Sequence, residues 1–462
     1  MVVGQVPEGV DLLVVGAGPG GYTAALRAAQ LGREVTLVDR DGSAGVGGVC
    51  LRTGCIPSKA LIEVADTAHR ARSWSRAGLR AEGLAVDLGA FQRFKSEAVT
   101  RLGDAVRRQL DAAGVRVLPG RACFTRPAQA AIERDDGPSR FVEFRDVILA
   151  TGSRPMELRE LPHDEERVLD STDALCLHAL PASVAVVGGG FIGVELGTAL
   201  AKLGAHVTIV EALDRLLPAL DAAVAPPVQR RLAALGVDVL VSAQARDFDG
   251  RRLKVETTGG SVLVEADALV VAVGRRPNSD GLGLERLGVR PRPDGLLEVG
   301  PDRLAGPHIA AIGDLTPGPA LAHKATAEAE VAAEALCGRP AAFDPAAVPA
   351  VVFSDPEVAV AGLSVAHARA AGMTTRVATV PLAASARAVT LGLDKAEGFV
   401  RLVIDADADA VVGAQIVGPH ACELIAEAVL AIEMAASPTD LAGTIHPHPT
   451  LSELLAQAAR VT

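Results

Sequence analysis

The chain has 462 residues, of which 49% are hydrophobic and 22% are charged, and its formal net charge is −11 at neutral pH. This length predicts about three domains, and the apolar content is ample for several cores. The acidic balance and the 3% content of aromatic residues argue against a nucleic-acid partner, because neither a phosphate-binding surface nor a base-stacking platform is indicated.

The cysteine usage and the N-terminal sequence indicate a cellular compartment. Six cysteines are too few for a structural disulfide framework in so long a chain, and they favour a reducing compartment in which any disulfide is catalytic. The first ten residues carry no basic side chain, so no signal peptide is predicted. The uncharged run 174–194 contains Pro181 and four glycines and is interpreted as a loop and a strand, not a membrane span. We expect a cytoplasmic protein without a membrane partner.

A strand, a glycine-rich turn, a helix and a second strand open the chain. Residues 11–15 are apolar, residues 16–21 read Gly-Ala-Gly-Pro-Gly-Gly, a helical run extends through Leu31, and a strand over 34–38 ends at Asp39. Glycines in this pattern permit a tight turn and the close approach of a pyrophosphate to a helix N-terminus, and the acid accepts ribose hydroxyls. The pattern therefore predicts a dinucleotide site.

Two cysteines five positions apart, Cys50 and Cys55, follow in the segment 47–59, GGVCLRTGCIPSK. On a regular helix their Cα atoms would lie about 8.7 Å apart, beyond the reach of a disulfide. Gly54 and the preceding glycines allow a bend that brings the sulfurs together. A bend at a helix start also places a thiolate near the positive end of the helix, which lowers a thiol pKa. A bare spacing of this kind equally suits buried or metal-binding cysteines, but the upstream glycine turn and the downstream His-Pro-His-Pro-Thr segment favour a redox-active disulfide.

The same plan recurs later in the chain. Residues 183–187 form an apolar strand, residues 188–193 read Gly-Gly-Gly-Phe-Ile-Gly, a helical run extends through Leu203, and a strand over 206–210 ends at Glu211. Two complete copies, each with an acid about twenty residues after its glycines, argue against an accidental match.

The remaining elements are predicted from apolar runs and breakers. Strands are expected at 141–150, 268–277 and 308–314, the last ending in Gly313-Asp314, and an alanine-rich helix at 320–336. Three prolines in 340–349 indicate a linker. Beyond it, strands at 398–404 and 411–417 and a helix at 420–436 predict an α+β domain.

These motifs, in this order, resemble the pyridine-nucleotide disulfide oxidoreductases, and among them most closely the dihydrolipoamide dehydrogenases. The likeness runs almost the full length, through both glycine turns, the cysteine segment, Leu321-Ala322-His323-Lys324 and the segment 446–453, HPHPTLSE. The resemblance implies an α/β protein with two Rossmann-like dinucleotide-binding domains and a C-terminal α+β dimerisation domain. The implied domains are an FAD-binding domain with the disulfide at 1–152, an NAD-binding domain at 153–280, a central segment completing the FAD site at 281–349, and an interface domain at 350–462.

The resemblance also assigns the catalytic residues. Cys50 is implied as the interchange thiol and Cys55 as the flavin-proximal thiol, with Lys59 near the flavin and paired with Glu195. His448 is implied as the base, oriented by Glu453, and a histidine suits this role because it titrates near neutrality. His446 is interpreted as structural. Three departures from the family pattern are Asp39 in place of Glu, Val49 in place of Thr and Pro447 in place of Ala.

Two cofactors follow from the chemistry, because a thiolate cannot hand hydride to NAD⁺ directly and a flavin must lie between them. The residues implied to bind FAD are Gly16, Gly18, Gly21, Asp39, Lys59, Gly152, Asp314 and Ala322. Those implied to bind NAD are Gly188, Gly190, Gly193, Glu211 and Gly274. Glu211 favours NAD because a carboxylate there repels a 2′-phosphate. Phe191 either covers the flavin or packs in the core, and no metal ligands are assigned.

The expected activity is the oxidation of protein-bound dihydrolipoamide to lipoamide with transfer of hydride to NAD⁺. The implied partners are a second copy of the chain, which shares the active site, and the lipoyl domains and E2 core of a 2-oxo acid dehydrogenase complex or the glycine cleavage system. Two alternatives stay open. One is another FAD-dependent NAD(P)H disulfide reductase of the glutathione-reductase type, and the other is a non-catalytic flavoprotein subunit of such a complex.

Overall fold

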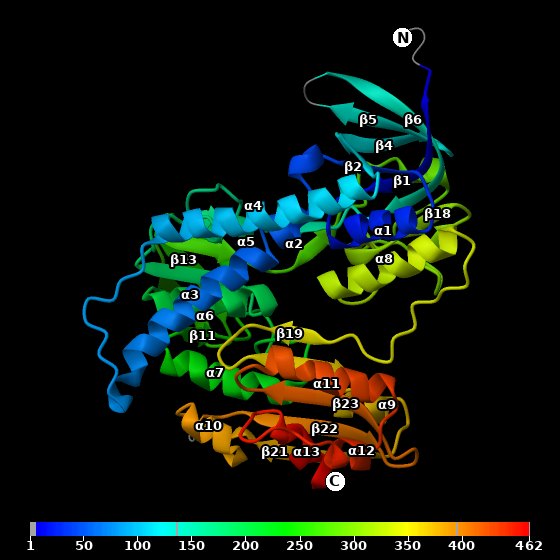
Figure 1. The fold of residues 1–462 in the computed structure, drawn as a ribbon. Coiled ribbons are helices and arrows are strands. Elements are labelled where there is room, and N and C mark those ends of the chain that lie inside the picture. The colour runs from blue at the N-terminus through cyan, green and yellow to red at the C-terminus, as the bar shows by residue number, and fades with distance from the viewer. Residues whose placement is uncertain (1–5, 135–136, 394–395, 462) are drawn as a thin grey trace. The chain divides into compact units, whose positions relative to one another are not determined.

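The computed structural model describes residues 6–134, 137–393 and 396–461 (Figure 1). The chain divides into two compact units. The first comprises Met1–Ala60, Gly89–Met156 and Gly274–Asp344, and the second comprises Leu61–Leu88, Glu157–Val273 and Pro345–Thr462. These two units are defined by packing and not by function, so the division into four functional domains stays a prediction.

The first unit is built on a sheet with the strand order β17-β18-β6-β1-β2-β3. Its strands are β1 (Glu8–Val15), β2 (Val35–Asp39), β3 (Arg116–Pro119), β6 (Gly137–Leu149), β17 (Leu304–Gly306) and β18 (Ile309–Ala311). Strands β18, β6, β1, β2 and β3 run parallel. The consecutive residues Leu12, Leu13 and Val14 of β1 are fully buried, as expected for a parallel strand covered on both faces.

Further elements of the first unit surround this sheet. Strands β4 (Arg121–Arg126) and β5 (Gln129–Arg134) continue it in antiparallel fashion from β6, and β7 (Ser153–Pro155) pairs with β16 (Arg275–Pro277). Helices α1 (Pro19–Gln30) and α8 (Ala322–Leu336) contribute buried alanines to one core cluster, and small side chains let the helices approach closely.

Three helices carry or follow the cysteine segment. They are α2 (Gly48–Arg52), α3 (Cys55–Ser73) and α4 (Leu88–Ala112). The break between α2 and α3 falls at Thr53 and Gly54, which confirms the predicted bend.

The second unit contains a five-stranded parallel sheet with the order β11-β10-β9-β15-β8. Its strands are β8 (Val168–Leu169), β9 (Ser183–Val187), β10 (His206–Val210), β11 (Asp238–Leu240) and β15 (Ala268–Val271). Helices α5 (Ser171–Ala174), α6 (Phe191–Leu203) and α7 (Ala225–Ala234) accompany it. An antiparallel sheet of β12 (Gln244–Phe248), β13 (Arg252–Thr257) and β14 (Gly260–Glu265) belongs to the same unit.

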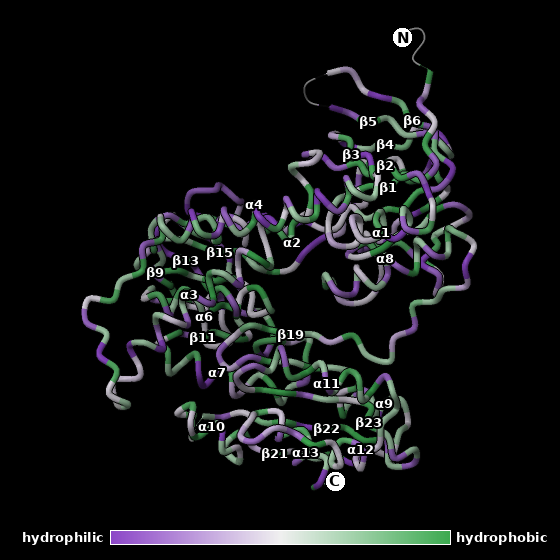
Figure 2. Tube along the Cα trace, viewed as in Figure 1, coloured by the Kyte–Doolittle hydropathy of each residue, from purple (hydrophilic) through white to green (hydrophobic). Residues whose placement is uncertain are grey.

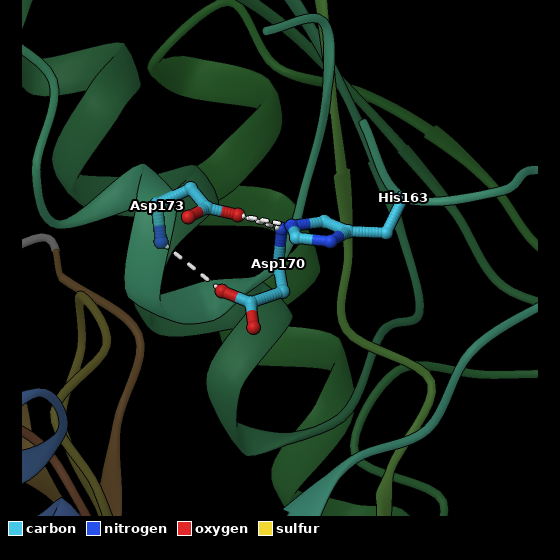
Figure 3. A group of neighbouring side chains, drawn as sticks. All are labelled: His163, Asp170 and Asp173. Carbon is cyan, nitrogen blue, oxygen red and sulfur yellow. Dashed lines mark hydrogen bonds and ion pairs between the residues drawn. The ribbon is translucent and has the colours of Figure 1, made fainter. Parts of the chain in front are cut away.

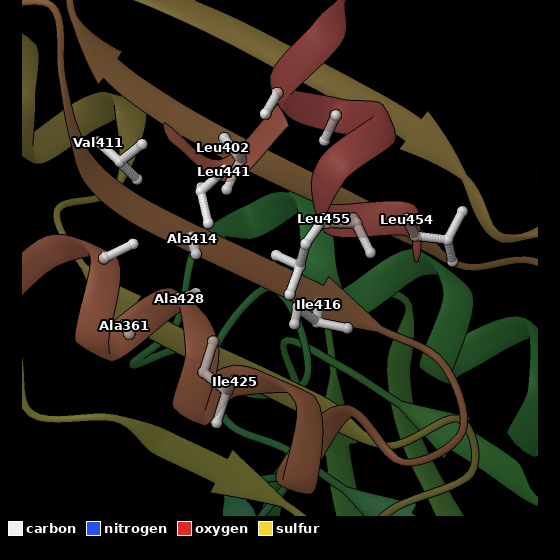
Figure 4. Packing of buried hydrophobic residues seen from close by; sticks show 14 of the residues in the cluster. Ala361, Leu402, Val411, Ala414, Ile416, Ile425, Ala428, Leu441, Leu454 and Leu455 are labelled. Atoms are coloured by element: carbon white, nitrogen blue, oxygen red, sulfur yellow. The ribbon is translucent and has the colours of Figure 1, made fainter. Parts of the chain in front are cut away.

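The C-terminal part of the second unit is an antiparallel sheet with helices, which confirms the predicted α+β character. The sheet order is β19-β20-β23-β22-β21. The strands are β19 (Ala350–Val352), β20 (Val358–Gly362), β21 (Thr375–Pro381), β22 (Phe399–Asp405) and β23 (Ala410–Val417), and the helices are α9 (Val365–Ala370), α10 (Ala386–Thr390), α11 (Ala421–Glu433), α12 (Pro438–Gly443) and α13 (Glu453–Arg460). Strands β22 and β23 consist largely of hydrophobic residues (Figure 2). Leu402, Ile416, Ile425 and Leu455 meet in one buried cluster (Figure 4).

Most predicted elements are present, and two predicted strands differ from the expectation. The strand expected at 268–277 is two short strands, β15 and β16, because Gly274 adopts a positive φ of 125° between them. The strand expected at 308–314 covers only Ile309–Ala311 and is followed by a single helical turn, Gly313–Leu315. Among the described residues, none of the helices is both long and apolar enough to span a membrane.

Candidate functional site

The first glycine turn leaves room in front of a helix N-terminus. A Cβ on Gly16 would lie 2.3 Å from the carbonyl oxygen of Ala150, and one on Gly21 would lie 1.8 Å from the oxygen of Gly16. These two glycines are therefore required by the backbone itself. A Cβ on Gly18, the N-cap of α1, would meet nothing within 4 Å. The open side of Gly18 at the N-terminus of α1 fits a pyrophosphate.

The second glycine turn has the same geometry. A Cβ on Gly188 would lie 2.4 Å from the oxygen of Ala272, and one on Gly193 would lie 1.9 Å from the oxygen of Gly188. A Cβ on Gly190, the N-cap of α6, again meets nothing within 4 Å. The residues of both turns thus fit a dinucleotide, and their contacts with one stay a prediction.

The acid at the end of each second strand holds its glycine turn. The backbone N–H of Ala17 donates to Asp39 Oδ2 at 2.9 Å. The N–H of Gly189 donates to Glu211 Oε2 at 2.7 Å, and the N–H of Leu213 donates to Glu211 Oε1 at 2.7 Å. A carboxylate oxygen has two acceptor sites, so each acid retains capacity for a ribose hydroxyl, the role predicted for it.

The two cysteines flank the bend between α2 and α3 and are both thiols in this structure. The hydrogen bond with Cys55 and the burial of the side chain raise the pKa of the Cys50 thiol, and the positive charge of Lys59 offsets part of this rise. The expectation that the bend lowers a thiol pKa concerned a helix start, the position of Cys55 at the beginning of α3, and for that residue it stays a prediction. The disulfide between the two stays a prediction.

Asp314 is oriented by two residues that the sequence reasoning did not identify. The hydroxyl of Ser153 donates to Asp314 Oδ2 at 2.5 Å, and Arg275 Nε donates to Ser153 Oγ at 2.8 Å. Gly152 directly precedes Ser153, and Gly274 directly precedes Arg275. The two predicted glycines thus directly precede the residues that form a hydrogen-bond relay from Arg275 to Asp314. The Gly-Arg-Arg-Pro sequence at 274–277 was the signal that could have pointed to this relay.

A buried ion pair holds the turn that carries Asp314. Glu328 is fully buried and accepts the N–H of Gly313 at 2.7 Å, while Lys324 Nζ donates to Thr316 Oγ1 at 2.9 Å. Burial lowers the pKa of Lys324, and the nearby Glu328 charge opposes this shift. Both residues lie on α8, whose first residue is the predicted contact Ala322. The sequence reasoning missed this pair because an alanine-rich helix with scattered charges resembles a solvated one.

His448 and Glu453 are paired as predicted. His448 Nδ1 lies 2.9 Å from Glu453 Oε1, and the N–H of Thr450 donates to Glu453 Oε2 at 2.8 Å. The hydrogen bond from His448 lowers the pKa of Glu453, so the carboxylate stays charged. The His448 side chain is 72% exposed. By contrast, the buried His446 ring contacts Glu427 Oε1 at 2.7 Å and the carbonyl of Thr444, a structural environment.

Glu195 is buried on α6, where its Oε1 accepts the backbone N–H of Phe353 at 2.9 Å. Lys59 lies on α3 near Cys50. Their pairing stays a prediction. Phe191, the first residue of α6, is half-buried, and both interpretations of its role stay open.

A separate group of metal-ligating side chains, His163, Asp170 and Asp173, is explained by a helix cap (Figure 3). Asp170 caps α5, and the N–H of Asp170 donates to Asp173 Oδ2 at 2.9 Å, forming a capping box. Asp173 Oδ2 also contacts His163 Nε2 at 2.6 Å and raises the pKa of His163. The group satisfies the helix start without an ion.

Family models match nearly the whole chain. The model described as pyridine nucleotide-disulphide oxidoreductase matches residues 10–329, and that described as the dimerisation domain of the same family matches residues 348–459. The chain belongs to this family. It is therefore an α/β flavoprotein oxidoreductase that uses FAD and NAD.

Curated relatives and solved structures agree with this membership. The chain is 44% identical to dihydrolipoyl dehydrogenase from Geobacillus stearothermophilus, with 100% of this chain and 98% of the relative covered. It is 42% identical to dihydrolipoyl dehydrogenase from Bacillus subtilis, with 100% and 98% covered. The structure of LpdA from Mycobacterium tuberculosis superposes with a TM-score of 0.89 at 30% identity, covering 98% of this chain and 99% of the other.

Proposed function

We propose that this enzyme oxidises dihydrolipoamide carried on a protein to lipoamide and passes the electrons through FAD to NAD⁺. The observation that carries the proposal is the bend that brings Cys50 into hydrogen-bonding contact with Cys55, next to a glycine turn fit for FAD. The relatives with full-length identity of 42–44% are dihydrolipoyl dehydrogenases, which supports this substrate over others of the same chemistry.

The proposed thiol exchange uses His448 as the proton carrier. One substrate thiol gives its proton to His448 and attacks the Cys50 sulfur of the disulfide, and Cys55 leaves as a thiolate. The second substrate thiol then attacks the substrate sulfur bound to Cys50, which closes lipoamide. Its proton passes to the departing Cys50 sulfur, so Cys50 returns as a thiol. Because the pKa of Cys50 is raised, this thiol keeps its proton, and the reverse reaction needs a base to remove it.

The remaining assignments concern the cofactors. When bound, FAD supplies the two-electron step between dithiol and nicotinamide. We assign its pyrophosphate to the turn at Gly18 and its ribityl chain to Asp314, whose carboxylate the Arg275–Ser153 relay orients. We assign NAD to the turn at Gly190 with Glu211 on the ribose, and we infer that Lys59 and Glu195 pair beside the flavin.

A second copy of the chain completes the proposed site. The chain has a dimerisation domain, and large apolar side chains are exposed at the end of α11 and just before the His446 segment, namely Leu430, Met434 and Ile445. We infer that a second copy covers these side chains and places its own His448 beside Cys50. Beyond the dimer, the proposed partner is the lipoyl domain and E2 core of a 2-oxo acid dehydrogenase complex or of the glycine cleavage system. The cytoplasmic location stays a prediction from cysteine usage.

The function is tested by substrate competition on the purified holoenzyme. We expect a yellow protein that reduces NAD⁺ with dihydrolipoamide and that turns red on partial reduction. Glutathione disulfide with NADPH should give no comparable turnover. Preferential reduction of glutathione disulfide would instead support the glutathione-reductase alternative, and a yellow protein with no turnover would support the non-catalytic subunit.

The shared site is tested by mixing subunits. His448→Gln should slow thiol–lipoamide exchange by ~10²–10⁴, the usual contribution of a positioned base, while NADH still reduces the flavin. A heterodimer of a Cys50→Ser chain and a His448→Gln chain has one intact site if the base acts across the dimer, so it should regain up to half of wild-type turnover. An inactive heterodimer would show that the base acts within its own chain.

A further inference from the structure

A buried lysine on α6 joins three segments of the second unit. The Lys202 side chain is 4% exposed, and its Nζ lies 2.6 Å from Asp66 Oδ1 on α3 and 2.7 Å from Asp355 Oδ2. Arg231 on α7 also binds Asp355, with Nε donating at 3.0 Å. Burying an ammonium group is costly unless it is paired. A buried, paired lysine therefore indicates a specific role that an apolar side chain at the same position could not serve.

The same face of α6 carries Glu195. Lys202 follows Glu195 by seven residues, which is two helical turns, so both side chains lie on one face about 10.5 Å apart along the axis. The segment after β19 contacts both of them. The N–H of Phe353 donates to Glu195 at 2.9 Å, and two residues later the Asp355 carboxylate contacts Lys202. The segment 353–355 therefore contacts α6 at two points, Glu195 and Lys202.

The interior of this short segment is also held in place. The hydroxyl of Ser354, which is buried, donates to the carbonyl oxygen of Pro356 at 2.6 Å. Burial alone would raise the pKa of Asp355, but Lys202 and Arg231 keep it below its usual range. Asp355 is thus charged and anchored on two cations, which leaves the Phe353 amide little freedom to move relative to Glu195.

We propose that Lys202 and Asp355 act as positioning residues that fix the Phe353 amide on Glu195 and thereby orient Glu195 for electron transfer between the flavin and the nicotinamide. This inference rests on the proposed function, which places Glu195 beside the flavin with Lys59. Neither Lys202 nor Asp355 touches the reacting atoms. They contribute by holding the Glu195 carboxylate in the orientation that it needs when the nucleotide is bound.

The test separates the two half-reactions of the holoenzyme by rapid mixing. Lys202→Met keeps the side-chain length and removes the charge, and a misplacement of about 1 Å at a reacting group costs up to about 10²-fold in rate. We expect NADH to reduce the flavin of Lys202→Met about 10-fold to 100-fold more slowly, with thiol–lipoamide exchange unchanged. Lys202→Arg should restore most of the rate, because it retains the charge.

Two further variants keep the test decisive. Asp355→Asn is nearly isosteric and should also slow the reduction of the flavin by NADH. Glu195→Gln should slow this reduction less in the Lys202→Met background than alone, because both substitutions act through the orientation of the side chain at position 195. The control is Ile404→Val, a core change in β22 that lowers stability without touching α6, and it should leave both half-reactions unchanged. If Lys202→Met does not fold, Asp355→Asn carries the measurement.

The outcomes distinguish this inference from the proposed function. Wild-type NADH reduction in both Lys202→Met and Asp355→Asn would overturn the positioning role. An equal slowing of both half-reactions, without rescue by Lys202→Arg, would overturn it as well and indicate general loss of structure. If NADH fails to reduce the flavin of the wild-type enzyme, the proposed function fails before the positioning role is reached.

Discussion

The two glycine turns dock the segment that follows their second strand in the same way. In the first copy the carbonyl of Ala17 accepts the N–H of Gly47 at 2.8 Å, and in the second the carbonyl of Gly189 accepts the N–H of Leu217 at 2.8 Å. In both copies the acid binds the N–H of that same residue, Ala17 or Gly189. The second residue of each turn, Ala17 or Gly189, is therefore held at both its N–H and its carbonyl.

The docked segments differ, because only the segment of the first copy carries a cysteine, Cys50. A Cβ on Gly48 would lie 2.6 Å from Gly18 Cα, so only glycine lets the start of α2, with Cys50, lie this close to the first turn. The corresponding position in the second copy is filled by the buried side chains of Leu216 and Leu217. The first copy thus places the helix that carries Cys50 next to its glycine turn, and the second copy fills the corresponding space with apolar side chains.

The largest expected effect comes from blocking one turn at a time. Because a Cβ on Gly18 or Gly190 meets no protein atom within 4 Å, Gly18→Val and Gly190→Val should fold yet fill the space intended for pyrophosphate. Gly18→Val should purify without FAD absorbance. Gly190→Val should stay yellow but lose reduction by NADH.

The control for this pair is Gly9→Val, since a Cβ on Gly9 on β1 also meets nothing and no role is assigned to it. Gly9→Val should keep both FAD and NADH reduction. If Gly18→Val retained FAD and Gly190→Val lost it, the assignment of the two turns would be reversed.

The next prediction isolates the thiols that only the first copy carries. Cys50→Ser should abolish dihydrolipoamide turnover but leave the Cys55 thiolate able to form a long-wavelength band with the flavin. Cys55→Ser should lose both the band and turnover. Visible spectra and steady-state assays of the two variants measure this, and full turnover in either variant would rule out the assigned roles.

Sequence reasoning was strongest where chemistry depends on neighbouring residues. The glycine turns and the bend between α2 and α3 follow from local spacing, whereas the contact of His448 with Glu453 five positions later was implied by the family resemblance. The relay from Arg275 through Ser153 to Asp314 joins residues up to 161 positions apart, and no periodicity indicates which strand ends meet. The raised pKa of Cys50 was likewise out of reach, because it depends on burial and on the rotamers that bring two sulfurs together.

The smallest predicted effect concerns the preference for NAD over NADP and how the acid after the second strand of each copy, Asp39 or Glu211, affects it. The wild-type enzyme should prefer NAD over NADP by roughly 2–4 kcal/mol, which is one or two charge-assisted hydrogen bonds plus repulsion of the phosphate, or roughly 30-fold to 900-fold in kcat/KM. Glu211→Ala and Glu211→Arg should narrow this ratio. Glu211→Gln separates charge from structure, because its side-chain oxygen still accepts one of the two backbone N–H groups that Glu211 binds.

The matched variant in the first copy is Asp39→Asn, which also loses a charge from an acid that holds its glycine turn. Since the first turn is assigned to FAD, Asp39→Asn should weaken FAD retention while the ratio of kcat/KM for NAD and NADP stays at the wild-type value. Glu211→Gln should do the opposite, narrowing the ratio without loss of FAD. Equal kcat/KM for the two nucleotides in the wild-type enzyme would refute the role of Glu211. A change of the ratio in Asp39→Asn as large as that in Glu211→Gln would show that the two acids do not discriminate separate cofactors, because a copy that binds only FAD cannot read the 2′-position of NADP.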